Sequence, residues 1–158
     1  MQLLRVFNNN VVLARRGAED VIVTGRGIGF QAKPGTEVDP AKVVKVFVPD
    51  SGRDPDHLAA MIAGIPGGYV QLIIDAMHSV DMSEALRSKL TLVVAIADHI
   101  HGAVSRGNTV SYPLEAEVRH LYAEDFSLAQ KLLTAINRGL HTPLAADEAV
   151  AITLHLVN

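Results

Sequence analysis

The sequence predicts an α+β chain of two modules, a small antiparallel β-sheet followed by an all-α helical bundle. Short β-branched and aliphatic runs, separated by asparagine and glycine, fill the first 50 positions. Proline, glycine and polar residues without an apolar period occupy 48–55. Beyond them, apolar residues recur at helical spacing. We therefore expect a β-domain at 1–50, a linker with a short helix at 51–64 and a helical domain at 65–158.

The first module is expected to hold four short strands, at 3–7, 11–14, 21–23 and 45–47. Asn8, Asn9 and Asn10 separate the first two, because asparagine tolerates the left-handed backbone that hairpin turns require. A single sheet of this size buries little apolar surface and is marginal on its own. We therefore expect the sheet to pack on another surface, most simply on a second copy of itself.

The second module is expected to hold helices at 54–64, 69–80, 81–106, 113–122, 125–137 and from 147 to the chain end. The longest begins at Asp81, with Glu84 three residues later as in a capping box. Apolar residues cover most of its circumference, including Leu90, Val93 and Ile100. A helix of this kind is expected at the centre of a bundle.

Composition excludes several classes of protein. The chain has no cysteine, so disulfides, thiolate metal sites and thiol nucleophiles are absent, as fits a reducing compartment. The longest apolar stretch is far shorter than the roughly 20 residues that a bilayer requires. We therefore expect a cytoplasmic protein without membrane insertion. The net charge of -3 is uneven: 1–50 carries a basic surplus, whereas 51–158 is acidic and holds all seven histidines.

A glycine-rich segment, Gly25-Arg26-Gly27-Ile28-Gly29-Phe30, follows the third strand. Its spacing is not that of a dinucleotide-binding loop, and Pro34 follows where a helix would have to begin. The segment suits RNA better, because Arg26 can fork onto a phosphate or a guanine edge and Phe30 can stack on an unpaired base. Alternatively, the asparagines only turn a hairpin and Phe30 only fills a small core. The residues alone leave both interpretations open.

The histidines form no recognisable metal motif. His99 and His101 are two apart on one helix and so point about 200° apart, which prevents them from chelating one ion. A lone histidine on an apolar helix is usually a core or boundary residue, and this is our interpretation of His57, His78, His101, His120 and His141. We expect no metal, no cofactor and no catalytic constellation.

Residues 1–47 resemble the co-antiterminator RNA-binding domain of the BglG/SacY family of bacterial transcriptional antiterminators. The matching segments are 5–12, 21–31 and 45–47. The resemblance implies a symmetric homodimer that binds a bulged RNA hairpin in a leader transcript and prevents an overlapping terminator from forming; DNA is not expected as a partner. Position by position, it implies RNA contacts from Arg5, Asn8, Asn10, Gly25, Arg26 and Phe30.

Residues from about 65 onward resemble the first regulation domain of that family, which responds to the sugar phosphotransferase system. The matches are Asp98-His99-Ile100 followed by Arg106, then 147–149 and 154–158. They imply that His99 and His155 accept phosphoryl groups from phosphotransferase-system proteins, which in the family typically switches RNA binding off. Asp98 could then accept a hydrogen bond from the modified ring or repel it.

Relatives of this kind usually carry a second regulation domain, whereas this sequence stops at Asn158. Taken together, the residues and the resemblance predict an RNA-binding antiterminator that is not an enzyme. The alternatives are a regulatory dimerisation module and a histidine phosphoryl carrier, neither of which would bind RNA.

Overall fold

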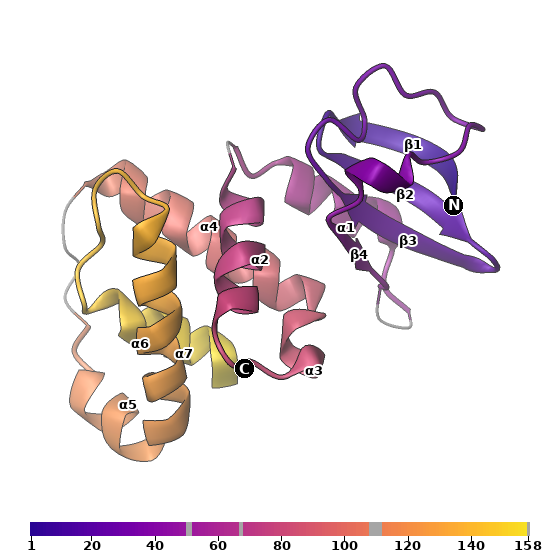
Figure 1. The fold of residues 1–158 in the computed structure, drawn as a ribbon. Helices are drawn as coiled ribbons and strands as arrows, with labels where there is room; N and C mark the ends of the chain where they lie inside the picture. Colours follow the sequence, from indigo (N-terminus) through magenta and orange to yellow (C-terminus); the bar gives the residue numbers. More distant parts are fainter. Residues whose placement is uncertain (50–51, 67, 108–111, 158) are drawn as a thin grey trace. The chain divides into compact units, whose positions relative to one another are not determined.

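The computed structural model describes residues 1–49, 52–66, 68–107 and 112–157. The chain divides into two compact units, Met1–Pro66 and Gly67–Asn158 (Figure 1). The first contains a β-sheet and one α-helix, and the second is all-helical. The expected α+β order, sheet first and helices after, is confirmed. The expected domain boundary between residues 50 and 51 lies outside the described residues.

The sheet is an antiparallel meander in the order β1-β2-β3-β4. Its strands are β1 (Gln2–Asn8), β2 (Val11–Arg16), β3 (Glu19–Thr24) and β4 (Lys45–Phe47), so all four expected strands are confirmed. In the central pair, Val12 lies opposite Val23 and Leu13 opposite Ile22. Since side chains alternate between faces, this register sends apolar residues to both sides of the sheet.

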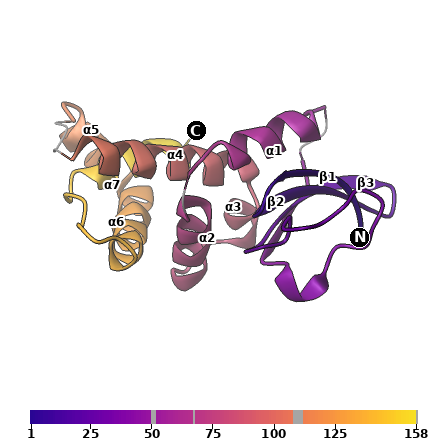
Figure 2. The same cartoon turned by 90° about the horizontal axis from the view of Figure 1, so that it is seen from above.

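Each face of the sheet is covered from within the same unit. One face forms a core with Ile28 and Val38 from the connection between β3 and β4, and its strand members are Leu3, Val12, Ala14, Val21 and Val23. The other face, with buried Leu13, Ile22 and Phe47, packs against α1 (Pro55–Ala63) (Figure 2). The sheet was expected to pack on another surface, and α1 of the same chain provides that surface for one of its two faces.

Local signals explain the bounds of α1. Asp54 is its N-cap, and its carboxylate accepts a hydrogen bond from the backbone N–H of Asp56. Pro55 occupies the first turn, where its missing N–H costs nothing. The buried positions Leu58, Ala59 and Ile62 form one stripe, which faces the sheet.

The helical unit contains α2 (Tyr69–Ser79), α3 (Glu84–Arg87), α4 (Leu90–Arg106), α5 (Glu115–Leu121), α6 (Ala123–Arg138) and α7 (Glu148–Val157). Helix α4 packs against α2, α3 and α7, and α6 lies along α7 (Figure 1). Eight residues of α4 are buried, which confirms its expected central place in the bundle. Among the described residues, no helix is both long enough and apolar enough to cross a bilayer.

The expected single helix at 81–106 is wrong, because the segment forms two helices. Ser83, not Asp81, caps α3, since its hydroxyl accepts a hydrogen bond from the N–H of Leu86. Lys89 has an extended backbone (φ -77°, ψ 104°), which ends the first helix and starts α4 at the buried Leu90. Neither serine nor lysine is a strong helix breaker, so the apolar periodicity ran across the break.

Candidate nucleic-acid interface and histidine cluster

The hairpin turn at Asn8–Asn10 and the glycine-rich loop at 25–30 form one continuous structure. Backbone N–H groups of Gly25 and Gly29 donate to the carbonyl oxygens of Asn10 (3.0 Å) and Asn9 (2.9 Å). The side-chain oxygen of Asn10 accepts from the N–H of Gly27 at 3.1 Å. Two turns far apart in sequence therefore make one surface, which we call the tip surface (Asn8–Asn10 and 25–30).

At two positions of the loop, neighbouring backbone lies so close that only glycine fits. A Cβ on Gly25 would overlap the backbone carbonyl of Lys42, and a Cβ on Gly29 would overlap the carbonyl of Asn8. Gly27 has a positive φ of 75°, which disfavours other residues. The Lys42 ammonium also donates to the carbonyl oxygen of Gly27 at 3.4 Å. A role for Lys42 could not be predicted from the sequence, because its contact with the loop depends on the fold bringing the chain back to the loop.

The tip surface presents a guanidinium, an aromatic ring and an amide. Arg26 and Asn10 are exposed, and Phe30 remains 57% exposed. The small core beneath is filled instead by Ile28, which is 4% exposed. Of the two interpretations left open by sequence, the one that places Phe30 in the core is therefore wrong. The asparagines do shape the turn, since the side chain of Asn8 accepts from the N–H of Asn10 at 2.7 Å.

Arg5 and Asn8 lie on the face of the sheet that α1 covers. The guanidinium of Arg5 pairs with Asp56 at 3.2 Å and lies 5.0 Å from the ring centroid of Phe7. The amide nitrogen of Asn8 donates to the carbonyl oxygen of Ala63 at 3.2 Å. Five of the six sequence-predicted contact residues thus belong to the tip surface: Asn10, Arg26 and Phe30 are exposed there, Asn8 also contacts α1, and Gly25 is buried beneath the loop. Arg5 lies outside the tip surface and pairs with α1.

In the helical unit, the two predicted phosphoacceptors lie together. His99 on α4 and His155 on α7 have ring centroids 5.8 Å apart in an edge-to-face arrangement. Nε2 of His99 lies 2.6 Å from Oε2 of Glu148, at the start of α7. Glu148 is only 2% exposed, although it is a charged residue type. His101 faces elsewhere, with its ring against Tyr69, as the two-residue spacing predicted.

Two further side chains satisfy the buried carboxylate of Glu148. The hydroxyl of Tyr112 donates to Oε2 at 2.9 Å, and the guanidinium of Arg106 lies 3.8 Å from Oε1. Burial, and next the hydrogen bond to Glu148, raise the pKa of Tyr112 to about 12. Burial, and next the neighbouring His99, lower the pKa of His155. We call these five residues, His99, Arg106, Tyr112, Glu148 and His155, the histidine cluster.

Glu148 and Tyr112 were not among the site residues predicted from the sequence. In the unmodified chain Asp98 is exposed, and the hydrogen bond of His99 goes to Glu148. The two roles considered for Asp98 concern the phosphorylated ring and stay predictions. The only available signal was that Glu148 and Arg106 stand inside the segments that resemble a regulation domain. Within the described part of the chain, no group of three or more histidine, aspartate or glutamate residues is placed to hold a metal ion.

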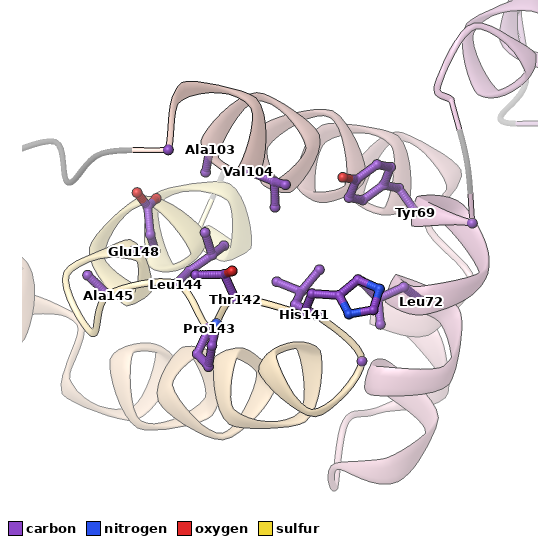
Figure 3. A pocket seen from close by; sticks show the side chains of 14 residues that line it. Tyr69, Leu72, Ala103, Val104, His141, Thr142, Pro143, Leu144, Ala145 and Glu148 are labelled. Carbon is purple, nitrogen blue, oxygen red and sulfur yellow. The ribbon is translucent and has the colours of Figure 1, made fainter.

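A cavity of about 680 Å³ adjoins the cluster. Its walls come from the start of α2, the C-terminal half of α4 and the 139–145 connection between α6 and α7. Figure 3 shows Glu148 at one end of this pocket and Leu72 with His141 toward the other. The other lining residues are largely apolar. Glu148 is only 2% exposed, and its carboxylate contacts His99 and Tyr112.

The chain thus joins a sheet unit with an exposed tip surface to a helical unit in which two histidine rings lie together. Models of known families match both units. The chain belongs to the PRD domain family, which matches residues 73–158, and residues 1–54 match the CAT RNA binding domain. These matches confirm both parts of the resemblance seen in the sequence.

Similar curated proteins include Protein GlcT of Staphylococcus epidermidis, 27% identical over 99% of this chain. Transcription antiterminator LicT of Bacillus subtilis is 28% identical over 100% of the chain, and the Beta-glucoside operon antiterminator of Dickeya chrysanthemi is 32% identical over the same share. The chain spans 57% of the length of the first and third of these relatives and 58% of LicT.

A crystal structure of GlcT CAT-PRDI has the same fold. Its TM-score is 0.71 at 23% identity, and the match covers 99% of this chain and 95% of that one. This likeness agrees with the order of a sheet unit followed by a helical unit.

Proposed function

We propose that this protein is an RNA-binding transcriptional antiterminator of the bacterial cytoplasm. It acts by binding and not as an enzyme: the sheet unit holds a bulged hairpin of a leader transcript, and the helical unit adjusts that binding through histidine phosphorylation. The observation that carries the proposal is the tip surface, where Arg26, Phe30 and Asn10 are exposed on one hydrogen-bonded scaffold. Relatives named as antiterminators support it.

The groups of the tip surface suit RNA in complementary ways. A guanidinium pairs with phosphate or a guanine edge, an exposed aromatic ring stacks on an unpaired base, and an amide both donates and accepts at base edges. Gly25 fits close to neighbouring backbone, so the loop that bears Arg26 is fixed before RNA arrives. A preformed surface loses less conformational entropy when it binds. Arg5 and Asn8 extend the proposed contact toward α1.

A second copy of the chain completes the proposed binding unit. Val44 and Val48 flank the short edge strand β4 and are each 46% exposed. Exposed apolar residues beside an open strand edge favour association with another chain. Sedimentation equilibrium of the full chain is expected to give a dimer that binds one hairpin. A well-folded monomer that bound the hairpin equally tightly would contradict this part of the proposal.

Phosphotransferase-system proteins are the proposed phosphoryl donors for His99 and His155. A phosphoryl group adds about −1.5 to −2 charges near neutral pH. In the histidine cluster, that charge would arrive beside the buried carboxylate of Glu148. An added charge of this size changes the electrostatics of a partly buried site, so we expect phosphorylation to alter the contact between α4 and α7.

The proposed function is tested by titrating the full chain with bulged leader-RNA hairpins from sugar operons at increasing salt. Phosphate contacts release counterions, so affinity for the correct hairpin should fall steeply as salt rises. A stem of equal length without the bulge is the control and should bind more weakly. Absence of binding to every such hairpin at low salt would contradict the proposal and leave a regulatory dimerisation module or a phosphoryl carrier.

A further inference from the structure

We propose that Glu148 is a positioning residue, which holds the ring of His99 so that a phosphoryl group enters at Nδ1 and not at Nε2. The inference rests on the proposed function, because it takes His99 as a phosphoryl acceptor. It goes further by assigning the reacting atom and the residue that selects it.

The contact between His99 and Glu148 determines which ring nitrogen is available. Oε2 of Glu148 lies 2.6 Å from Nε2 and also accepts the hydroxyl hydrogen of Tyr112. An ionised carboxylate can only accept hydrogen bonds, so Nε2 must carry the hydrogen that it donates. In the neutral ring, the lone pair is then on Nδ1. Within the described part of the chain, the structure gives Nδ1 no hydrogen-bond partner.

Glu148 is held firmly enough to impose this arrangement. Its side chain is 3% exposed. Oε2 is hydrogen-bonded to Nε2 of His99 and to the hydroxyl of Tyr112, and Oε1 lies 3.8 Å from the guanidinium of Arg106. The side chain of His99 is 18% exposed, so a phosphoryl donor can reach the ring. A buried carboxylate with several partners is costly to move, because moving it would leave a charge unpaired.

The transfer at Nδ1 balances without moving a proton to or from the protein. The donor is a phosphohistidine, whose N–P bond breaks while the lone pair on Nδ1 of His99 forms the new N–P bond. The donor ring is protonated on its other nitrogen, so the nitrogen that keeps the electron pair of the broken bond leaves as part of a neutral imidazole. The ring of His99 becomes a phosphorylated imidazolium, whose positive charge lies beside the carboxylate of Glu148. Throughout, Nε2–H of His99 remains bonded to Glu148. Because both N–P bonds are of the same kind, positioning supplies most of the help.

Transfer to Nε2 would have a different cost. Nε2 would have to lose its hydrogen and the bond to Glu148, and the new phosphoryl charge would face the buried carboxylate directly. Two negative groups in contact within a buried site are strongly unfavourable. The geometry therefore selects Nδ1.

The first test is the tautomer of His99 in the unmodified chain, measured by ¹H–¹⁵N long-range NMR with ¹⁵N-labelled histidine. The expected result is a ring protonated at Nε2, with Glu148→Gln giving a mixture of tautomers. A wild-type ring protonated at Nδ1 would overturn the inference without bearing on whether the protein binds RNA or is phosphorylated.

The second test uses potassium phosphoramidate as a small phosphoryl donor, followed by the same NMR measurement. His99 is expected to carry phosphorus on Nδ1, whereas the exposed His57 and His120 serve as internal controls for unassisted rings. Glu148→Gln should lower the Nδ1 to Nε2 product ratio at His99 by at least about tenfold, the lower range for a hydrogen bond to a charged group. Tyr112→Phe, which keeps the carboxylate, should lower it less.

The outcomes separate the two claims. Phosphorus on Nε2 of wild-type His99 would overturn the assignment while leaving His99 as an acceptor. Phosphorylation of His57 and His120 but not His99 would overturn both the inference and the proposed regulation. If Glu148→Gln fails to fold, the wild-type linkage and Tyr112→Phe still decide the matter.

Discussion

The tip surface and the histidine cluster hold their functional side chains in opposite ways. Arg26 and Phe30 are exposed, and the backbone beneath them is fixed by hydrogen bonds and close-packed glycines. The ring of His99 is held by a hydrogen bond to the buried Glu148, and the ring of His155 lies edge-to-face against that of His99. A surface on rigid backbone is suited to recognition, whereas a buried network of ionisable groups changes state when one charge is added. The difference matches the two proposed tasks of binding and control.

The largest expected effect comes from breaking the backbone scaffold. Gly29→Ala should destabilise the sheet unit by about 1–3 kcal/mol, the usual range for overpacking, because the new Cβ meets the carbonyl of Asn8. Hairpin binding should fall with it, although Gly29 presents no side chain. Thermal unfolding and a binding titration measure both quantities. Gly68→Ala is the control, since nothing lies within 4 Å of its Cβ position. Unchanged stability in Gly29→Ala would contradict the scaffold account.

Removing an exposed group should weaken binding and leave the fold intact. Arg26→Ala is expected to reduce hairpin affinity roughly 10- to 100-fold, as loss of one good arginine contact does. If the contact is to phosphate, the salt dependence should also fall by about one counterion. The matched control is Arg16→Ala, an exposed arginine at the other end of β2. Equal affinity loss in both variants would point to general charge and not to the tip surface.

The histidine cluster should be visible in a tyrosine titration. The pKa of Tyr112 is about 12, so its phenol should ionise after that of an ordinary tyrosine near 10. Because the folded pKa is the higher one, this group's contribution to stability is full below about pH 10 and is lost as pH rises toward 12. Ultraviolet absorbance of the wild type and Tyr112→Phe measures the difference. A late-titrating phenol that survives in Tyr112→Phe would refute the assignment.

A smaller effect is expected at mildly acidic pH. Burial and His99 lower the pKa of His155, so the unfolded chain takes up a proton before the folded one does. The free energy of unfolding should therefore decrease as pH falls below about 6.5. His155→Gln should flatten that decrease, as urea unfolding between pH 5 and 7.5 would reveal. His120→Gln, at an exposed position, should leave the pH profile as it is.

The smallest expected effect lies at Arg5, the proposed RNA contact outside the tip surface. Asp56→Asn removes the ion pair with Arg5 and one negative charge near the proposed interface. Exposed ion pairs are worth about 0–1 kcal/mol, so hairpin affinity should rise by no more than about fivefold. Glu19→Gln, which breaks the pair with Arg16, is the control. Weaker binding in Asp56→Asn would show that α1 supports the contact instead of competing for Arg5.

Much of the fold and part of the candidate site could be predicted from the sequence, and the features that could not have physical causes. The strands were predictable because β-branched runs alternate with asparagine and glycine turns. His99 and His155 were predictable because they lie in segments that resemble a regulation domain. The break between α3 and α4 was missed because it falls at Ser88 and Lys89, the C-cap of one helix and the N-cap of the next, and neither residue type is a strong helix breaker. Glu148 was missed because it lies 49 residues from His99 in sequence, and local periodicity carries no information on such a contact.

The most direct test of the account is NMR mapping of the ¹⁵N-labelled full chain during addition of a bulged leader hairpin. We predict that backbone shifts concentrate in Asn8–Asn10 and 25–30, with smaller changes at Arg5. Shifts confined to the helices, or spread evenly over basic residues such as Arg16 and Arg138, would contradict the claim that a preformed surface at the end of the sheet recognises RNA.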